Sequence, residues 1–210
     1  MQGKFELLQM PPVNTNSVLL SVGDKCVIFD AWGRASDWIK ILNERGLNLT
    51  AIYSTHGHGD HISAAPELSE KLNIPWYLNH FDIPLIEWGN GLLEYFELPK
   101  IKPDYKQPLD LIAGHYEILG LSVQVFELPG HSAGGVGFYF PAEKILIQGD
   151  TLFQESVGRT DVPGGNKKVL EQSIAQIYNF NLPDDTIVVF GHGAHSTIAE
   201  LKINNPYFKA

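Results

Sequence analysis

The segment 54–61 carries the side chains with the most obvious chemistry in this sequence. Within six positions it places three imidazoles and a carboxylate, namely His56, His58, His61 and Asp60. Imidazole is the commonest side-chain ligand of zinc and related metals, and carboxylates complete such sites. Gly57 and Gly59 separate the ligands, so the backbone can turn sharply enough to direct several side chains to one point. The segment predicts a metal site rather than a solvated polar loop.

Three further metal-competent residues each follow an apolar, strand-like run and a glycine. They are His131, Asp150 and His192. Residues at the ends of neighbouring strands converge in space, so we expect these three to join the first segment. Seven ligands exceed the about three protein ligands of a mononuclear catalytic zinc. They suit two ions that share a bridging carboxylate.

Apolar runs and helical patterns alternate along the chain and predict the elements that must position these ligands. We expect strands over 18–22, 26–30, 49–55, 74–78, 116–118, 121–128, 136–140, 145–148 and 186–190. We expect helices over 36–45, 61–72 and 167–180, and a short one from about 197. Ser36 is predicted to cap the first helix and Gly46 to end it. Hairpins in both halves predict two packed sheets with helices on their outer faces.

Two features near the predicted site have open interpretations. Asp30 ends a strand and is expected to support the ligands or form a turn rather than to bind metal. The segment 81–108 is rich in aromatics and prolines. It either lies over the mouth of the site or is a plain structural connection.

The four motifs, taken in this order, resemble the metallo-β-lactamase superfamily over nearly the whole chain. The resemblance implies an α/β fold, a four-layer αββα sandwich, as a single domain over 1–210. It also implies a role for each ligand. The first metal would be held by His56, His58 and His131, and the second by Asp60, His61 and His192, with Asp150 bridging.

Within the superfamily, the stretch 149–165 is most similar to glyoxalase II-like hydrolases, specifically the short bacterial subgroup of hydroxyacylglutathione hydrolase-like enzymes. Zinc β-lactamases lack this ligand set with a bridging aspartate, and the diiron flavoprotein branch has a glutamate among its first ligands. Arg159 falls near the family's glutathione-contacting lysine, which implies a substrate-binding role. The alternative for Arg159 is a structural ion pair with Asp161.

The resemblance implies hydrolysis of a thioester of the S-lactoylglutathione type. Two divalent ions, zinc by expectation with iron or manganese as alternatives, would lower the pKa of a shared water toward neutrality. Asp60 and Asp150 are the predicted catalytic residues, with Asp60 as a proton relay. A thiolate, whose conjugate acid has a pKa of roughly 8.5–9, leaves without protonation. No separate general acid is therefore needed, whereas an amide substrate would need one.

One alternative comes from a different class of enzyme. Persulfide dioxygenases share a Gly-Arg-Thr-Asp stretch like 158–161 and use a single iron held by two histidines and a carboxylate. Those roles would fall to His56, His131 and Asp150. A metallo-hydrolase of another small ester or lactone is the other alternative.

Composition limits the partners. The chain has 210 residues, 44% hydrophobic and 19% charged, which fits one globular domain. A net charge of −9 without a basic run argues against nucleic-acid binding. Cys26 is the single cysteine, so no internal disulfide can form. The first residues lack a signal pattern and no apolar run reaches membrane length, so we expect a cytoplasmic enzyme without membrane partners.

Overall fold

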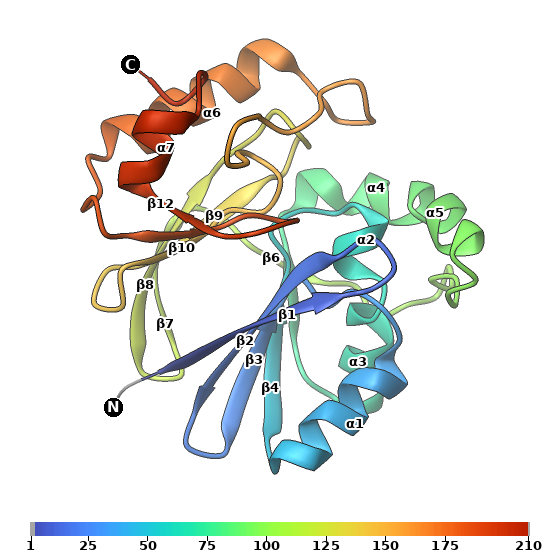
Figure 1. The fold of residues 1–210 in the computed structure, drawn as a ribbon. Coiled ribbons are helices and arrows are strands. Elements are labelled where there is room, and N and C mark those ends of the chain that lie inside the picture. The colour runs from blue at the N-terminus through green and yellow to red at the C-terminus, as the bar shows by residue number, and fades with distance from the viewer. Residues whose placement is uncertain (1–2, 210) are drawn as a thin grey trace. The chain divides into compact units, whose positions relative to one another are not determined.

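The chain folds into two compact units, divided between Leu111 and Ile112. A computed structural model describes residues 3–209, so Met1, Gln2 and Ala210 lie outside the described residues. Each unit contains one six-stranded sheet and its own helices (Figure 1). The single domain over 1–210 stays a prediction.

The first unit is built on a mixed sheet in the order β1-β2-β3-β4-β5-β6. Its strands are β1 (Lys4–Met10), β2 (Thr15–Val22), β3 (Lys25–Phe29), β4 (Asn48–Tyr53), β5 (Trp76–Leu78) and β6 (Leu109–Asp110). β1, β2 and β3 form an antiparallel meander, which confirms the predicted hairpin. β3, β4, β5 and β6 run parallel, so their carboxyl ends lie at one edge of the sheet. Strand β1 was not predicted.

Three helices of the first unit lie along this sheet: α1 (Ala35–Arg45), α2 (Gly59–Ile62) and α3 (Ala65–Lys71). Figure 1 shows α1 and α3 side by side next to β4. Gly46 ends α1 in the left-handed conformation, as predicted. The predicted cap at Ser36 is wrong, because Arg34 is the N-cap and Ser36 lies inside the helix. The fully buried Trp38, whose Nε1 donates to the Trp32 oxygen, anchors this end of the helix by tertiary packing.

The predicted helix over 61–72 is wrong in its continuity, because α2 ends before α3 begins. At the break, the Ala64 amide donates to the Ala31 oxygen, and the Ser63 hydroxyl bonds both the amide and the oxygen of Gly33. Pro66 occupies the first turn of α3, where its missing N–H costs nothing. Contacts with the loop after β3 therefore replace the helical hydrogen bonds that periodicity alone predicts.

The segment 81–108 begins as three short helical elements that follow β5. They are η1 (His80–Asp82), α4 (Ile83–Trp88) and α5 (Asn90–Tyr95). The core of the unit includes Ile86 and Leu93 from this segment together with Trp32, Trp38 and Trp76. The segment is therefore an integral part of the first unit.

The second unit is built on a sheet in the order β12-β11-β10-β9-β8-β7. Its strands are β7 (Gly114–Ile118), β8 (Leu121–Glu127), β9 (Val136–Phe140), β10 (Ile145–Ile147), β11 (Ile187–Val189) and β12 (Ser196–Thr197). β7 to β10 are antiparallel neighbours, and β10 pairs parallel with β11. β8, β10 and β11 therefore point the same way, and their carboxyl ends share one edge.

Two helices cover this second sheet: α6 (Lys167–Asn179) and α7 (Ile198–Asn204). Leu170, Ile174 and Ile177 form the buried stripe of α6, as predicted, and pack with Leu146 and Val188 of the sheet. Thr197 caps α7 in a capping box with Glu200. No helix in residues 3–209 is long and apolar enough to cross a membrane.

Candidate metal centre

Four predicted ligands lie in the first unit, on the loop and short helix that follow β4. His56, His58 and His61 are buried, and Asp60 is half-buried. The ring of His56 lies 4.1 Å from that of His61 and 4.8 Å from that of His58, measured between centroids. Donor atoms of Asp60 and His61 lie within 4.8 Å of each other. The loop thus gathers three imidazoles and a carboxylate, as the sequence predicts.

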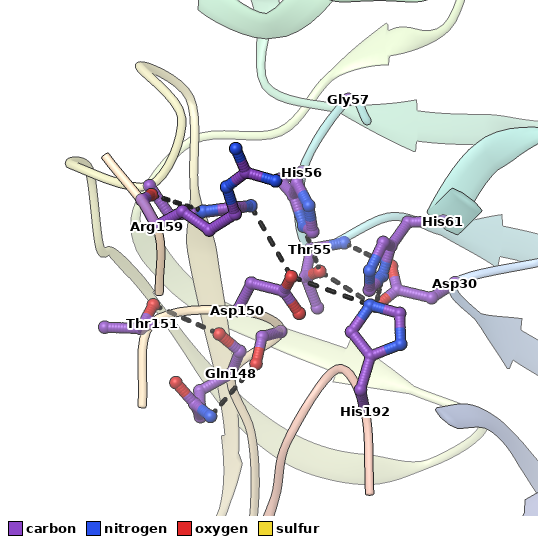
Figure 2. A network of polar contacts seen from close by, with 12 residues as sticks. Asp30, Thr55, His56, Gly57, His61, Gln148, Asp150, Thr151, Arg159 and His192 are labelled. Atoms are coloured by element: carbon purple, nitrogen blue, oxygen red, sulfur yellow. Dashed lines mark hydrogen bonds and ion pairs between the residues drawn. The ribbon is translucent and has the colours of Figure 1, made fainter. Parts of the chain in front are cut away.

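Asp30 orients two of these imidazoles, and Figure 2 shows it beside Thr55 and His61. Its Oδ2 lies 3.0 Å from Nδ1 of His61 and accepts the Thr55 hydroxyl at 2.8 Å, while Oδ1 accepts the Thr55 amide at 2.7 Å. Because that hydroxyl donates its hydrogen to Asp30, it must accept from Nδ1 of His56, 3.0 Å away. Both imidazoles therefore carry their proton on Nδ1 and offer Nε2 as the ligand atom. Asp30 thus contacts the predicted ligands His61 directly and His56 through Thr55, as the supporting role requires.

Two close contacts fix the same loop to the segment after β5. The Gly57 amide donates to Oδ2 of the fully buried Asp82 at 2.9 Å. A Cβ on Gly59 would lie 2.9 Å from the Gly89 oxygen, so the two backbones touch. These glycines are needed for close approach, and the ligand loop is clamped by η1 and α4.

Three predicted ligands lie in the second unit, each just beyond a strand of its sheet. His131 follows β8, Asp150 follows β10 and His192 follows β11. Nε2 of His131 lies 3.5 Å from Oδ2 of Asp150, and Nε2 of His192 lies 3.6 Å from the same oxygen. Figure 2 shows His192 pointing toward Asp150. The parallel strand ends thus bring the three donors together, as the sequence predicts.

His131 is oriented in the way that His56 and His61 are. Its Nδ1 donates to the backbone oxygen of Arg159 at 2.8 Å, which leaves Nε2 as the ligand atom. A Cβ on Gly158 would overlap the Asp150 backbone oxygen and lie 3.2 Å from Cβ of His131. The segment 158–159 therefore packs directly behind two predicted ligands.

A buried glutamine shapes the turn that carries Asp150. The side chain of Gln148 donates to the oxygens of Gly149 and Leu152 and accepts the Leu152 amide at 2.8 Å. The Thr151 hydroxyl donates to the Gln148 oxygen (Figure 2). Sequence reasoning missed this role and that of Asp82. One signal could have identified both residues. Gln148 directly follows the apolar run 145–147, and Asp82 directly precedes the apolar run 83–86.

The donor set fits divalent metal ions. Ligands at about 2.0–2.2 Å from a tetrahedral ion lie about 3.4 Å from one another. The 3.5 and 3.6 Å separations around Oδ2 of Asp150 match that value and exceed ordinary hydrogen bonds. Three imidazoles with a fixed Nδ1 proton, each presenting Nε2, are the form that metal-binding histidines take. Zinc, iron and manganese all accept such ligands.

Arg159 forms the ion pair that the sequence offered as its structural alternative. Its Nε and Nη2 donate to the two carboxylate oxygens of Asp161 at 2.9 and 3.1 Å, and both side chains are exposed. These hydrogen bonds and the attraction between the charges raise the pKa of Arg159 and lower that of Asp161. The substrate-binding role of Arg159 stays a prediction.

Comparison with known families agrees with this donor set. The model of the Metallo-beta-lactamase superfamily matches residues 10–192, which include all seven predicted ligands. The chain belongs to this superfamily. It is therefore a metallo-hydrolase by family.

Two similar relatives cover almost the whole chain. The probable metallo-hydrolase YqgX of Bacillus subtilis (strain 168) is 33% identical over 97% of this chain and 97% of its own length. The hydroxyacylglutathione hydrolase GloC of Haemophilus influenzae is 32% identical over 98% of both. The names agree on a hydrolase and differ in how far they specify the substrate.

Solved structures confirm the predicted fold class. BLEG-1, described as a B3 metallo-β-lactamase, is 34% identical with a TM-score of 0.87 and covers 99% of this chain and 100% of its own. TTHA1623 in a di-iron-bound form is 34% identical with a TM-score of 0.85, covering 96% and 99%. ETHE1 from Myxococcus xanthus is 25% identical with a TM-score of 0.73, covering 97% and 83%. The chain has the metallo-β-lactamase fold.

Proposed function

We propose that this protein hydrolyses thioesters of the S-2-hydroxyacylglutathione type, as a glyoxalase II-like enzyme. The observation that carries the proposal is the shared orientation of the imidazoles. Nδ1 of His56, His61 and His131 is held by a hydrogen bond, which suits Nε2 to a metal. The name of the GloC relative supports the thioester substrate.

Seven residues are proposed to hold two divalent ions, with zinc expected. His56, His58 and His131 would hold the first ion, Asp60, His61 and His192 the second, and Asp150 would bridge them. When bound, such a pair of ions supplies an activated water and polarises the substrate carbonyl. Hydrogen bonds within this chain hold the Nδ1 proton of His56, His61 and His131, and Asp60 is proposed to relay a proton.

The leaving group favours a thioester over an amide. Water gives up one proton, which Asp60 is proposed to relay to solvent, and the remaining hydroxide adds to the acyl carbon. The carbon–sulfur bond then breaks, and the products are a carboxylic acid and a thiolate. The thiolate departs without protonation because its conjugate acid has a pKa of roughly 8.5–9. An amine would need a proton donor. Arg159, exposed beside Asp161, is proposed to bind a carboxylate of the glutathione part. We expect the reaction in the cytoplasm.

Metal counting combined with a substrate comparison tests the function. The purified protein should contain about two metal ions per chain and cleave S-lactoylglutathione. Asp150→Ala should abolish cleavage, whereas Asp185→Ala, an exposed carboxylate paired with Lys144 in the same unit, should not. A β-lactam is the amide comparison, because BLEG-1 is described as a B3 metallo-β-lactamase. Metal-loaded protein that cleaves a β-lactam and no thioester would contradict the proposal.

A mononuclear iron persulfide dioxygenase is the second candidate. The stretch 158–161 supports it, because its Gly-Arg-Thr-Asp sequence is similar to one in persulfide dioxygenases, and its Arg159 oxygen accepts from the predicted ligand His131. In this alternative His56, His131 and Asp150 hold one iron. One iron per chain with oxygen uptake on glutathione persulfide, and no thioester cleavage, would establish it.

A further inference from the structure

An unusual stripe of apolar side chains faces outward on η1 and α4. Phe81, Pro84 and Trp88 are exposed and follow one another at helical spacing, so they share one side of the segment. The exposed fractions of Phe81 and Trp88 are 58% and 53%. We call these three residues the aromatic stripe. The opposite side of α4 is already apolar and buried, through Leu85 and Ile86, so the stripe is not needed for the core.

The aromatic stripe lies beside a predicted metal ligand. The indole of Trp88 is 5.9 Å from the imidazole of His58, measured between ring centroids, at an interplanar angle of 53°. Helices α4 and α5, green in Figure 1, contact α2, which carries the ligands Asp60 and His61. The stripe thus borders the ligand loop within the same unit.

The stripe is also held rigidly in place. Asp82, which lies next to Phe81 and is fully buried, accepts the Gly57 amide of the ligand loop. Gly89, which follows Trp88, touches the backbone of Gly59. Both ends of the stripe are therefore fixed to the loop that carries His56 and His58. A preformed surface of this kind binds a ligand with little ordering cost.

We propose that the aromatic stripe binds the apolar side chain of the acyl group, so the preferred thioester carries a larger and more apolar acyl group than lactoyl. This inference rests on the proposed thioesterase function. The exposed charged residues in 81–95 are Glu87, next to Trp88, and Glu94, which pairs with Lys100. The carboxylate of Glu87 repels the carboxylates of glutathione, and the apolar stripe suits an uncharged aliphatic or aromatic group.

Two matched thioesters test this assignment. S-mandeloylglutathione and S-lactoylglutathione share the thiol and the 2-hydroxyl and differ in a phenyl group against a methyl group. The wild type should have the higher kcat/KM on the mandeloyl compound. Trp88→Ala should lower the mandeloyl-to-lactoyl ratio of kcat/KM by on the order of three- to tenfold, the size of one aromatic pair. Trp88→Phe should retain most of the ratio, and Phe81→Ala should lower it less.

A matched control and a metal measurement separate binding from indirect effects. Tyr95→Ala removes another exposed aromatic from α5, 79% exposed, and should leave the ratio unchanged. Metal content should be the same in all variants. Equal loss on both thioesters in Trp88→Ala, or loss of metal from that variant, would overturn the proposal, because Trp88 would then act through His58.

A binding readout distinguishes this inference from the function itself. Trp32, Trp38 and Trp76 are buried, so Trp88 alone among the four tryptophans is open to quenching by acrylamide. Mandelate should protect Trp88 from quenching, and lactate at the same concentration should protect it less. If no thioester is cleaved, the proposed function fails, and this protection still decides whether the stripe binds an apolar acid. Equal protection by the two acids would overturn the inference.

Discussion

At the scale of single residues, the Asp30 carboxylate influences two predicted metal ligands at once. It is 1% exposed, and its backbone has a positive φ of 56°. Through Thr55 and directly, it fixes the proton positions of His56 and His61. Its neighbours are therefore two predicted metal ligands, so we expect its substitution to change metal binding first.

Asp30→Asn should weaken zinc binding by about ten- to hundredfold, the usual effect of removing a group that orients metal ligands. Asparagine tolerates a positive φ and has the same shape, so the fold should persist. Competition with a chromophoric chelator measures the affinity. Asp24→Asn is the matched control, because Asp24 is an exposed carboxylate just before β3 that accepts a hydrogen bond from the Asn48 side chain at the start of β4. Equal zinc affinity in the two variants would contradict the role of Asp30.

Cys26 should be inert in the native protein. The thiol is fully buried in β3, and this burial raises its pKa to about 11. At pH 8 only about one molecule in a thousand would carry the reactive thiolate, even with access to reagent. A disulfide reagent should label Cys26 in denaturant and not in buffer. Because the folded pKa is the higher one, this group's contribution to stability is complete below about pH 8.5 and falls as pH rises toward 11.

At the scale of elements, close backbone packing supports the ligand loops. Gly158 has no room for a Cβ against Asp150, whereas Gly91, inside α5, has no heavy atom within 4 Å of the same position. Replacing each glycine by alanine therefore makes the same chemical change in a tightly packed and in an open environment.

Gly158→Ala should lower metal content and stability, because the loop behind His131 and Asp150 must shift. Gly91→Ala should leave metal content unchanged and stabilise the protein by up to about 1 kcal/mol, since alanine favours helix. Metal analysis and urea unfolding measure both effects. A Gly158→Ala variant with full metal content would show that this packing is dispensable.

The sequence pattern predicted those helices and helix ends whose structure depends on residues close together in sequence. The buried stripe of α6 and the left-handed stop at Gly46 are set by neighbours in sequence. The break between α2 and α3 is not, because it depends on hydrogen bonds from Ser63 and Ala64 to the loop after β3. The position of α4 likewise depends on the contact of Gly89 with Gly59, which no local signal predicts.

At the scale of the whole molecule, the predicted ligands come from both halves of the sequence. Their identities could be predicted because histidine and aspartate after strand ends have few other uses. Their supports could not, because Asp82 and Gln148 act on backbone groups that become neighbours through the fold. Fold class followed from motif order, and the family match and solved structures confirm it.

Removing the metals should lower the unfolding temperature. Each of the two proposed ions, present at 100 times its dissociation constant, stabilises the folded chain by about 2.7 kcal/mol, so the pair contributes about 5.4 kcal/mol. For a chain of this length, that corresponds to roughly 10–20 °C, measured by differential scanning calorimetry with and without chelator. His192→Ala should show a smaller shift on chelation. His80→Ala, an exposed histidine paired with Asp110, should show the full one. No shift in the wild type would contradict the proposed metal centre.

The double attachment at Asp30 has a consequence for how the ions are taken up. The two imidazoles it fixes, those of His56 and His61, are the ones assigned to different ions. Binding of the first ion orders both imidazoles, because Asp30 connects them. The second ion then binds to an imidazole that is already ordered. Metal binding should therefore be cooperative, with little protein carrying one ion at substoichiometric zinc. In Asp30→Asn, the single binding step should become two.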